Sequence, residues 1–355
     1  MFANSHVLTR LASVLVPFAF AACSKSGAES SKPTPTESPR AAGTEAQLET
    51  TGAEKSPSGK PVKIAFSAPG ADHGWLAAIV KNAREEAKRL GDVTLEVSEG
   101  ASDPASQASQ VDAVVAGKPD VLILLPTDGQ ALTPAAQAAM RAHIPVVAVD
   151  RELGSPSAYR TWIGGDNFGI GFAAGNYIAD QLGCKGNVVE IQGIAGISVT
   201  ELRTKGFNEA LKRCNGGIQV VARQAANFLP DKGLEVMEAI LQAQRKIDAV
   251  YTHDDDMAMG VVAAIQNAKR DKEMFVTGAG GSKRAMELVK SGGLYRATFL
   301  YNPSMAASAV RLARLIAQGK GLRDLTEPEV PSRVQVPATP VTKENVEAFL
   351  KYGYE

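Results

Sequence analysis

Short apolar runs alternate with longer amphipathic stretches from Val62 onward. This alternation is typical of βαβ units around a parallel sheet. The runs are continuously apolar, as expected for strands that are covered by helices on both faces. We therefore predict one set of strands at 62–67, 93–97, 121–125 and 145–149, and a second set at 187–191, 218–222, 248–252 and 274–277.

The stretches between these runs have helical periodicity. Apolar residues recur every three or four positions from Trp75 to Leu90, which predicts a helix with one buried stripe. A further strand is expected at 295–300, a helix at 303–317 and a short helix near 344–350. No low-complexity linker separates the two sets, so the boundary near Gly165 should be a strand-like hinge. The predicted fold is α/β, with two doubly wound parallel-sheet lobes joined by this hinge.

The length of the chain agrees with two lobes. It has 355 residues, 45% hydrophobic and 21% charged, and domains usually span roughly 100–200 residues. We assign 61–165 plus about 302–332 to the first lobe, 166–301 to the second, and 333–355 to a C-terminal tail. Thirty-eight basic and thirty-eight acidic residues balance, so no net charge favours a nucleic-acid partner. Three cysteines are too few for a zinc ribbon, and we expect no metal and no cofactor.

Residues 1–23 have the pattern of an export signal. The apolar run from Leu11 to Ala22 follows Arg10 and is too short to span a bilayer of roughly 30 Å. It ends in Phe20-Ala21-Ala22-Cys23, which resembles the lipobox of bacterial lipoproteins. We therefore expect Cys23 to be lipidated and to anchor the exported chain in the cell envelope. The alternative is an ordinary cleaved signal with an incidental cysteine.

Residues 24–60 are predicted to form a disordered tether. The segment is composed mainly of Ser, Thr, Pro, Glu, Lys, Gly and Ala, and Leu48 is its single large apolar residue. Such a segment buries too little apolar surface to offset the entropy of ordering it. The tether restricts where the protein acts and leaves its activity open.

Polar and aromatic residues gather where the predicted strands end. In open parallel sheets, ligands bind beyond the carboxyl ends of the strands. Two facing lobes would bring to one cleft Pro69, Asp72, His73, Trp75, Thr127, Asp128, Asp150, Arg151, Ser198, Arg203, Asn227, Phe228, His253, Asp254, Asp255, Gly280 and Gly281. A sugar has apolar C–H faces and a rim of hydroxyls, so it needs aromatic surfaces and hydrogen-bonding side chains together. Trp75 and Phe228 supply the aromatic faces.

The charged candidates suit the rim of such a ligand. The carboxylates of Asp150 and Asp254 would accept hydrogen bonds from hydroxyls, and Arg151 and Arg203 would donate them. Purely structural roles remain possible for these residues. Asp150 could form an ion pair with Arg151, Arg203 could form a salt bridge to Glu201 or Asp254, and Trp75 could belong to the core. We take Trp162, in the run before the hinge, as a core residue.

Several ordered motifs resemble the periplasmic ribose-binding protein family. They are Val62 to Phe66, Leu124 to Asp128, Ile144 to Arg151, Ile194 to Phe207 and Asp254 to Gly260. Gly74-Trp75, Tyr251-Thr252-His253 and the closing Tyr352-Gly353-Tyr354 look more like the galactofuranose-binding relatives. The resemblance covers roughly residues 61–355. It implies a monomeric sugar binder, with two lobes closing on three crossovers, that delivers its ligand to an ATP-driven (ABC) importer through a membrane permease and its ATPase.

The same resemblance implies which residues contact the ligand. Carried over position by position, the contacts fall on His73, Trp75, Leu76, Asp150, Arg151, Arg203, Phe228, Asp254 and Tyr301. The chain departs from the ribose pattern at Leu125, Asp254, Tyr301 and Gly280, which stand where the family has asparagine, asparagine, glutamine and aspartate. The departures point to the wider class of sugars and sugar alcohols. Together with Asp72, these contacts except Leu76 are the predicted ligand-binding residues.

Three further features have competing interpretations. A metal site within His253 to Asp256 is disfavoured because consecutive residues cannot converge on one ion, and we expect Asp255 or Asp256 to cap the helix that follows. Gly278 to Gly281 is expected to be a tight turn, since it lacks the full phosphate-loop pattern. Cys184 and Cys214 fall at one edge of the second sheet, where they form a disulfide in an oxidising compartment or remain two free thiols.

These observations favour a non-enzymatic, lipid-anchored receptor for carbohydrate import, held in the periplasm or cell envelope and touching the membrane only through its anchor. The alternative within the same fold is a sensor that signals to a membrane kinase or chemoreceptor. An exported hydrolase is disfavoured because the chain has no Gly-x-Ser-x-Gly elbow and no His-Glu-x-x-His helix. A repressor is disfavoured by the export signal.

Overall fold

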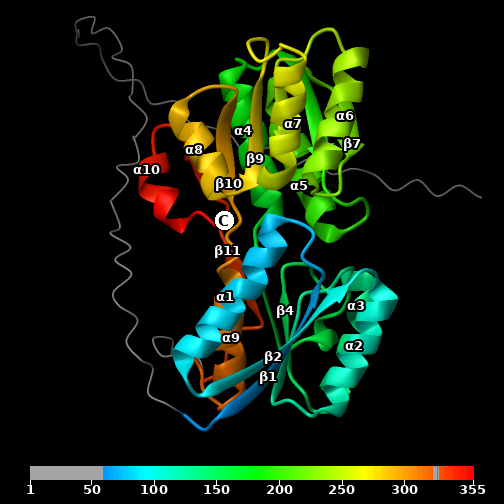
Figure 1. The fold of residues 1–355 in the computed structure, drawn as a ribbon, viewed down its shortest axis with the longest axis vertical. Coiled ribbons are helices and arrows are strands. Elements are labelled where there is room, and N and C mark those ends of the chain that lie inside the picture. Colours follow the sequence, from blue (N-terminus) through cyan, green and yellow to red (C-terminus); the bar gives the residue numbers. More distant parts are fainter. Residues whose placement is uncertain (1–58, 323–325, 327) are drawn as a thin grey trace, which may run out of the picture. The chain divides into compact units, whose positions relative to one another are not determined.

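Two six-stranded sheets organise the structure, a computed structural model that describes residues 59–322, 326 and 328–355 (Figure 1). All of these residues belong to a single compact unit. The predicted export signal, the lipidation site Cys23 and nearly all of the predicted tether lie outside the described residues. Each sheet, with the helices on its two faces, forms one lobe, which confirms the predicted fold class.

The first sheet has the strand order β11-β5-β4-β3-β1-β2, with every pairing parallel. Its strands are β1 (Val62–Pro69), β2 (Val93–Ala101), β3 (Val121–Leu124), β4 (Val146–Val149), β5 (Thr161–Gly165) and β11 (Arg333–Val336). Helices α1 (Gly74–Leu90) and α9 (Met305–Ala317) pack together on one face, and α2 (Pro104–Ala116) and α3 (Gly129–Arg141) on the other (Figure 1). Trp162 is buried against the α2 and α3 layer, as predicted.

The second sheet has the strand order β12-β10-β9-β8-β6-β7. Its strands are β6 (Gly186–Gln192), β7 (Ile218–Ala225), β8 (Ala249–Thr252), β9 (Phe275–Gly280), β10 (Tyr295–Leu300) and β12 (Pro340–Thr342), which alone is antiparallel to its neighbour. The flanking helices are α4 (Asn167–Gln181) with α5 (Ser198–Leu211), α6 (Pro230–Ala243) with α7 (Asp255–Asn267), α8 (Lys283–Ser291) and α10 (Val346–Phe349). Short 3-10 turns lie at Pro156–Ala158, Lys212–Cys214 and Leu350–Tyr352.

The chain crosses between the lobes three times, after β5, after β10 and after β11. The second crossing returns the chain to the first lobe, where α9 packs on α1. Residues 333–355, which we expected as a tail, contribute one strand to each sheet. All eight strands predicted in the two sets are present within a few residues of their expected bounds, as are the strand at 295–300 and the helix after it.

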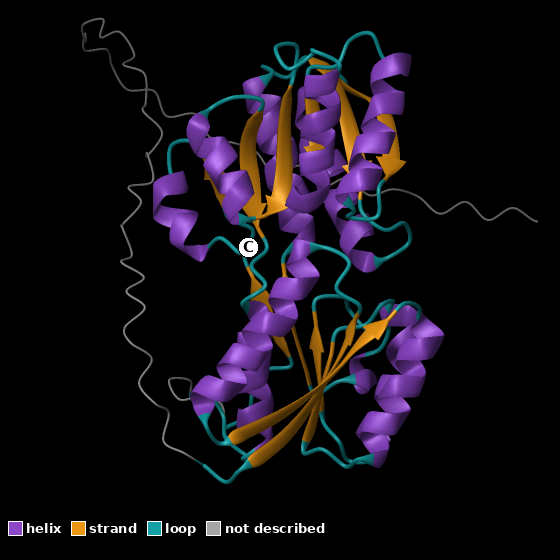
Figure 2. Ribbon diagram, in the orientation of Figure 1, coloured by secondary structure: helices purple, strands orange, loops and turns teal. Residues whose placement is uncertain are grey.

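The parallel strands of both sheets end at the boundary between the lobes, where their arrowheads converge in Figure 2. Three of the helices that begin at this edge start with aspartate N-caps, whose side chains accept hydrogen bonds from the first backbone amides. Asp103, Asp128 and Asp254 cap α2, α3 and α7 in this way. The sequence thus places helix starts and strand ends on one edge of each lobe, and the two edges face each other.

Cys184 and Cys214 form a disulfide in the structure, with their Cα atoms 5.0 Å apart. The bridge joins the segment before β6 to the turn after α5, at the edge of the second sheet where its strands begin. It therefore lies at the end of the second lobe that faces away from the first.

Candidate functional site

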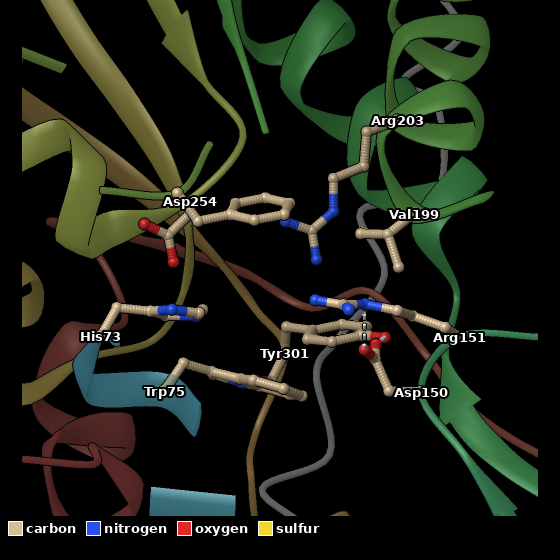
Figure 3. A pocket seen from close by; sticks show the side chains of 10 residues that line it. His73, Trp75, Asp150, Arg151, Val199, Arg203, Asp254 and Tyr301 are labelled. Carbon is tan, nitrogen blue, oxygen red and sulfur yellow. Dashed lines mark hydrogen bonds and ion pairs between the residues drawn. The ribbon is translucent and has the colours of Figure 1, made fainter. Parts of the chain in front are cut away.

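A small pocket lies between the lobes where the two sets of strands end. It is lined by residues of both lobes, namely His73, Trp75, Asp150, Arg151, Val199, Arg203, Phe228, Asp254, Gly280 and Tyr301. Figure 3 shows the guanidinium groups of Arg151 and Arg203 reaching into the space between Asp254 and Asp150. The structure thus brings together every predicted ligand-binding residue except Asp72.

Trp75 forms one wall of the pocket and also belongs to the core. Its side chain is 6% exposed, and Trp75 is the second residue of α1. The ring stacks on Tyr301 at 5.3 Å between centroids, and its Nε1 donates a hydrogen bond of 2.7 Å to the Tyr301 carbonyl. Since Tyr301 follows β10 at a crossover, this contact ties the first lobe to the hinge. The two roles weighed for Trp75, core and pocket wall, are therefore both filled.

Asp150 and Arg151 follow β4 and are both buried. Asp150 has a backbone φ of +65°, an uncommon conformation that asparagine and aspartate tolerate better than most residues. One of its oxygens accepts a hydrogen bond from the Tyr301 hydroxyl, and the other lies 3.7 Å from Arg151 Nε. Burial raises the pKa of Asp150, while the charge of Arg151 and the Tyr301 hydroxyl oppose that rise.

Arg151 is held by backbone oxygens of the first lobe. Its Nη1 donates to the carbonyls of Thr127 at 2.5 Å and Pro126 at 3.1 Å. Its Nε is buried and donates no hydrogen bond in the structure. A buried donor without a partner is unfavourable, so this atom is available to a ligand.

Arg203 projects from α5 of the second lobe. Its Nε donates to Asn167 Oδ1 at 2.9 Å, and its Nη1 donates to the carbonyl of His253. Its guanidinium carbon lies 4.7 Å from the centre of the Tyr301 ring, a cation–π contact. These contacts, rather than the ion pairs with Glu201 or Asp254 that we considered, hold Arg203 in place. The ring of His253 itself pairs with buried Glu190 at 2.9 Å, away from the pocket lining.

Phe228 and His73 contribute two more rings to the lining of the pocket. Their rings stack with centroids 6.1 Å apart. Phe228 has a φ of +65°, a rare conformation for a bulky residue that points to local strain. Gly193 makes room for it, because a Cβ at that position would lie 1.9 Å from Phe228 Cζ.

His73 is linked to the exposed side chain of Asp72 by a hydrogen bond of 2.6 Å to its Nδ1. Burial alone would lower the pKa of His73, but the hydrogen bond to Asp72 and the charge of that carboxylate raise it overall. Asp72 does not line the pocket. It lies at its mouth, where it orients His73.

Asp254 is the N-cap of α7 and also lines the pocket. Its Oδ1 accepts from the Met257 amide at 2.7 Å. We assigned this cap to Asp255 or Asp256, and the assignment was wrong. Asp255 is turned into the lobe, where it accepts hydrogen bonds from the amides of Gly281 and Ser282 and from two hydroxyls.

Asp256 makes a contact between the lobes, because its Oδ2 accepts from the Trp75 amide at 3.1 Å. Its charge also acts on Asp254. Burial, followed by the charge of Asp256, raises the pKa of Asp254 to about 8. Asp254 therefore carries a proton at neutral pH in the closed pocket, where it offers a donor as well as an acceptor.

The pocket is narrow, with a cavity volume of about 30 Å³. A more open cavity of about 550 Å³ adjoins it, since His73 and Arg151 line both.

The lining of the pocket differs from the predicted set of ligand contacts at three positions. Val199 was not singled out, although it is the second residue of α5, in the first turn after β6. Gly280 was named at a strand end but was not predicted to contact the ligand. Leu76, implied by the resemblance, is buried and lines the outer cavity instead. Apolar and glycine positions carry little chemical signal, so only their place at a strand or helix end could have indicated them.

No cluster of three or more metal-ligating side chains is found among the described residues. Within the same ranges, no helix combines the length and the apolar character that crossing a membrane requires.

Comparisons with known proteins agree with this geometry. The family described as "Periplasmic binding protein domain" matches residues 64–321. The chain is 32% identical over 262 residues to the ribose import binding protein of Bacillus subtilis. This alignment covers 74% of this chain and 83% of that protein. It is 32% identical over 306 residues to a galactofuranose-binding protein of Escherichia coli. That alignment covers 83% of this chain and 93% of the relative.

A solved structure shows the same architecture. It is an ABC transporter periplasmic solute binding protein from Actinobacillus succinogenes with bound D-allose, and it has a TM-score of 0.73 and 29% identity to this chain. The match covers 82% of this chain and 100% of that one. Together these findings confirm the resemblance seen in the sequence motifs: the chain belongs to the periplasmic binding protein family.

Proposed function

We propose that this protein is an exported, lipid-anchored receptor that captures a sugar or sugar alcohol between its lobes and delivers it to an ABC importer. The observation that carries the proposal is the lining of the pocket. Aromatic rings and charged hydrogen-bonding groups from both lobes line one narrow pocket. The names of the relatives, which describe ribose import and galactofuranose binding, support the sugar class.

The lining matches the two kinds of surface that a sugar offers. The rings of Trp75 and Phe228 suit its C–H faces. Asp150, Arg151 and Arg203 suit its hydroxyls, since hydrogen bonds that involve a charged group are roughly twice as strong as neutral ones. Binding without chemical conversion is the proposed role, in line with relatives that are named for import.

The lobes would close on the ligand. Because the pocket is narrow in this structure, a sugar would enter as the lobes part at the three crossovers. Closing again would bury the ligand and satisfy donors such as Arg151 Nε, which has no hydrogen-bond partner in the structure. The ligand would thus be part of what holds the lobes together.

A thermal-shift screen against pentoses, hexoses, furanoses and polyols tests the proposal. A ligand present at 100 times its dissociation constant stabilises the folded state by about 2.7 kcal/mol. We expect the melting temperature to rise by several degrees for a small subset of these compounds, which calorimetry then ranks and which are recovered chemically unchanged. Phe228→Ala should reduce the shift, and Phe172→Ala, at an exposed position on α4, should not. No shift from any compound at millimolar concentration would refute sugar binding.

The anchor and the delivery step are tested in the source cells. Deleting the gene should abolish uptake of the radiolabelled ligand, and the wild-type gene should restore it. Cys23→Ala should shift the protein from the membrane fraction to the soluble envelope fraction. Normal uptake without the protein would contradict delivery to an importer and favour a sensory role, and a membrane-bound Cys23→Ala variant would contradict the lipid anchor.

A further inference from the structure

Helix α1 starts differently from α2, α3 and α7, whose N-cap aspartates bind their own first amides. The ring of His73, at the N-cap position of α1, hydrogen-bonds to Asp72 instead, and the first turn of α1 contains no acidic residue. The first amides of a helix need partners, and a negative charge near them is favourable. The start of α1 therefore depends on a partner from another part of the chain.

That partner is Asp256, in the first turn of α7 in the second lobe. Its Oδ2 accepts a hydrogen bond from the Trp75 amide at 3.1 Å. Gly74 allows this approach, because a Cβ at that position would lie only 3.2 Å from both carboxylate oxygens of Asp256. In Figure 1 the start of α1 (blue) reaches the boundary between the lobes. Since the hydrogen bond joins the two lobes, it forms only when they lie together.

The start of α1 also carries two residues of the pocket. His73 and Trp75, on either side of Gly74, line it, whereas Asp256 does not. Asp256 thus contacts the backbone that presents these two rings to a ligand, without lining the pocket itself. A contact that forms on closure and does not involve the ligand favours the closed state, and it raises the apparent affinity for every ligand that closes the lobes.

We infer that Asp256 is a positioning residue for ligand capture, whose carboxylate caps α1 across the boundary between the lobes and so favours their closed arrangement. The inference rests on the proposed function, in which the lobes close on a sugar. When the lobes part, the start of α1 loses this acceptor and water takes its place. The exchange resembles the loss of an ordinary helix cap, which changes an equilibrium constant by about fivefold.

Calorimetry on the full chain tests the inference. The probes are D-ribose, D-galactose, D-allose and myo-inositol, together with any further sugar that the thermal-shift screen identifies. Each probe that binds should bind about fivefold more weakly to Asp256→Ala than to the wild type. The factor should be the same for all of them, because the carboxylate acts on closure. Asp256→Asn keeps an oxygen that can accept from the Trp75 amide, so its loss of affinity should be smaller.

Asp231→Ala is the matched control. Asp231 is an exposed aspartate in the first turn of α6, in the same lobe as Asp256. Each alanine variant loses one negative charge at the start of its own helix, so the two should lose similar stability in the absence of sugar. Asp231→Ala should nevertheless keep the wild-type affinity for every probe. A purely structural role for Asp256 would make the two variants alike in affinity as well.

A second route from Asp256 to the pocket runs through Asp254, because the charge of Asp256 helps to raise the pKa of that residue. Repeating the comparison in Asp254→Asn removes this route, since asparagine does not ionise. The Asp256→Ala substitution should weaken binding by the same factor in this background as in the wild type.

Three outcomes would overturn the inference. Asp256→Ala could bind every probe as tightly as the wild type. Its loss of affinity could differ strongly between sugars, as expected of a direct ligand contact, or could vanish in Asp254→Asn, as expected of an effect on that carboxyl alone. Failure of the wild type to bind any sugar would refute the proposed function itself, whereas sugar binding that does not depend on Asp256 would refute only the role of this residue.

Discussion

Replacing Trp75 with alanine is expected to lower the free energy of unfolding by about 3–5 kcal/mol, the usual cost of removing a large buried aromatic side chain. Trp75 is 6% exposed, stacks on Tyr301 and donates a hydrogen bond of 2.7 Å to the Tyr301 carbonyl. The variant would lose the packing, and it would also leave that carbonyl without its donor. Sugar affinity should fall as well, because the same ring lines the pocket.

Chemical denaturation and calorimetry measure the two effects separately. Trp75→Phe is the control: it keeps an aromatic ring on Tyr301 but removes the indole donor, so its loss of stability should be smaller. Trp162→Phe, in the core of the first lobe, gives a comparison at a tryptophan that does not line the pocket, although its indole donates to the Asp150 carbonyl at 3.1 Å. If Trp75→Ala unfolds at the same denaturant concentration as the wild type, Trp75 does not contribute to the core of the protein.

The lobes and most of the pocket could be predicted from the sequence for one physical reason. Continuous apolar runs identify the parallel strands, and the carboxyl ends of such strands gather at one edge of a sheet. Asp150, Phe228 and Asp254 therefore needed only their place after a strand. Strands β11 and β12 were not predicted because they are short and lack a continuous apolar run. In β11, exposed and half-buried residues alternate, as suits the edge of a sheet.

What the sequence could not show depends on contacts between distant segments. Tyr354 comes next to Gly280 only after α10 and the C-terminal segment fold onto α8, and nothing local signals this approach. The cap at Asp254 was misassigned because three aspartates stand in a row, and only the tertiary partners distinguish them. Asp255 meets hydroxyls of Tyr295 and Thr298 inside the lobe, while Asp256 meets the first lobe.

The buried state of Asp254 predicts an unusual dependence of stability on pH. Its pKa in the folded protein is raised to about 8 by burial and by the charge of Asp256, whereas an unfolded chain has a value of about 3.9. Between these values the folded state binds the extra proton, so stability is fully present at low pH and is lost as the pH rises toward 8. The slope from one such group reaches at most about 1.4 kcal/mol per pH unit.

Asp254→Asn isolates this contribution. Asparagine cannot ionise, yet it can accept the hydrogen bond from the Met257 amide and is itself a favourable N-cap. In sugar-free protein, the free energy of unfolding of the variant relative to wild type should therefore increase steadily between pH 5 and pH 8. Asp128→Asn, at the less buried N-cap of α3, controls for removal of charge at a helix start.

Urea denaturation at several pH values provides the measurement. Parallel curves for Asp254→Asn and the wild type would show that Asp254 is ionised throughout, as an ordinary carboxylate. The sugar would then meet an acceptor at this position. If the curves diverge as expected, the sugar instead meets a protonated carboxyl that can donate to a ring hydroxyl, and raising the pH above 8 should change affinity in the wild type but not in Asp254→Asn.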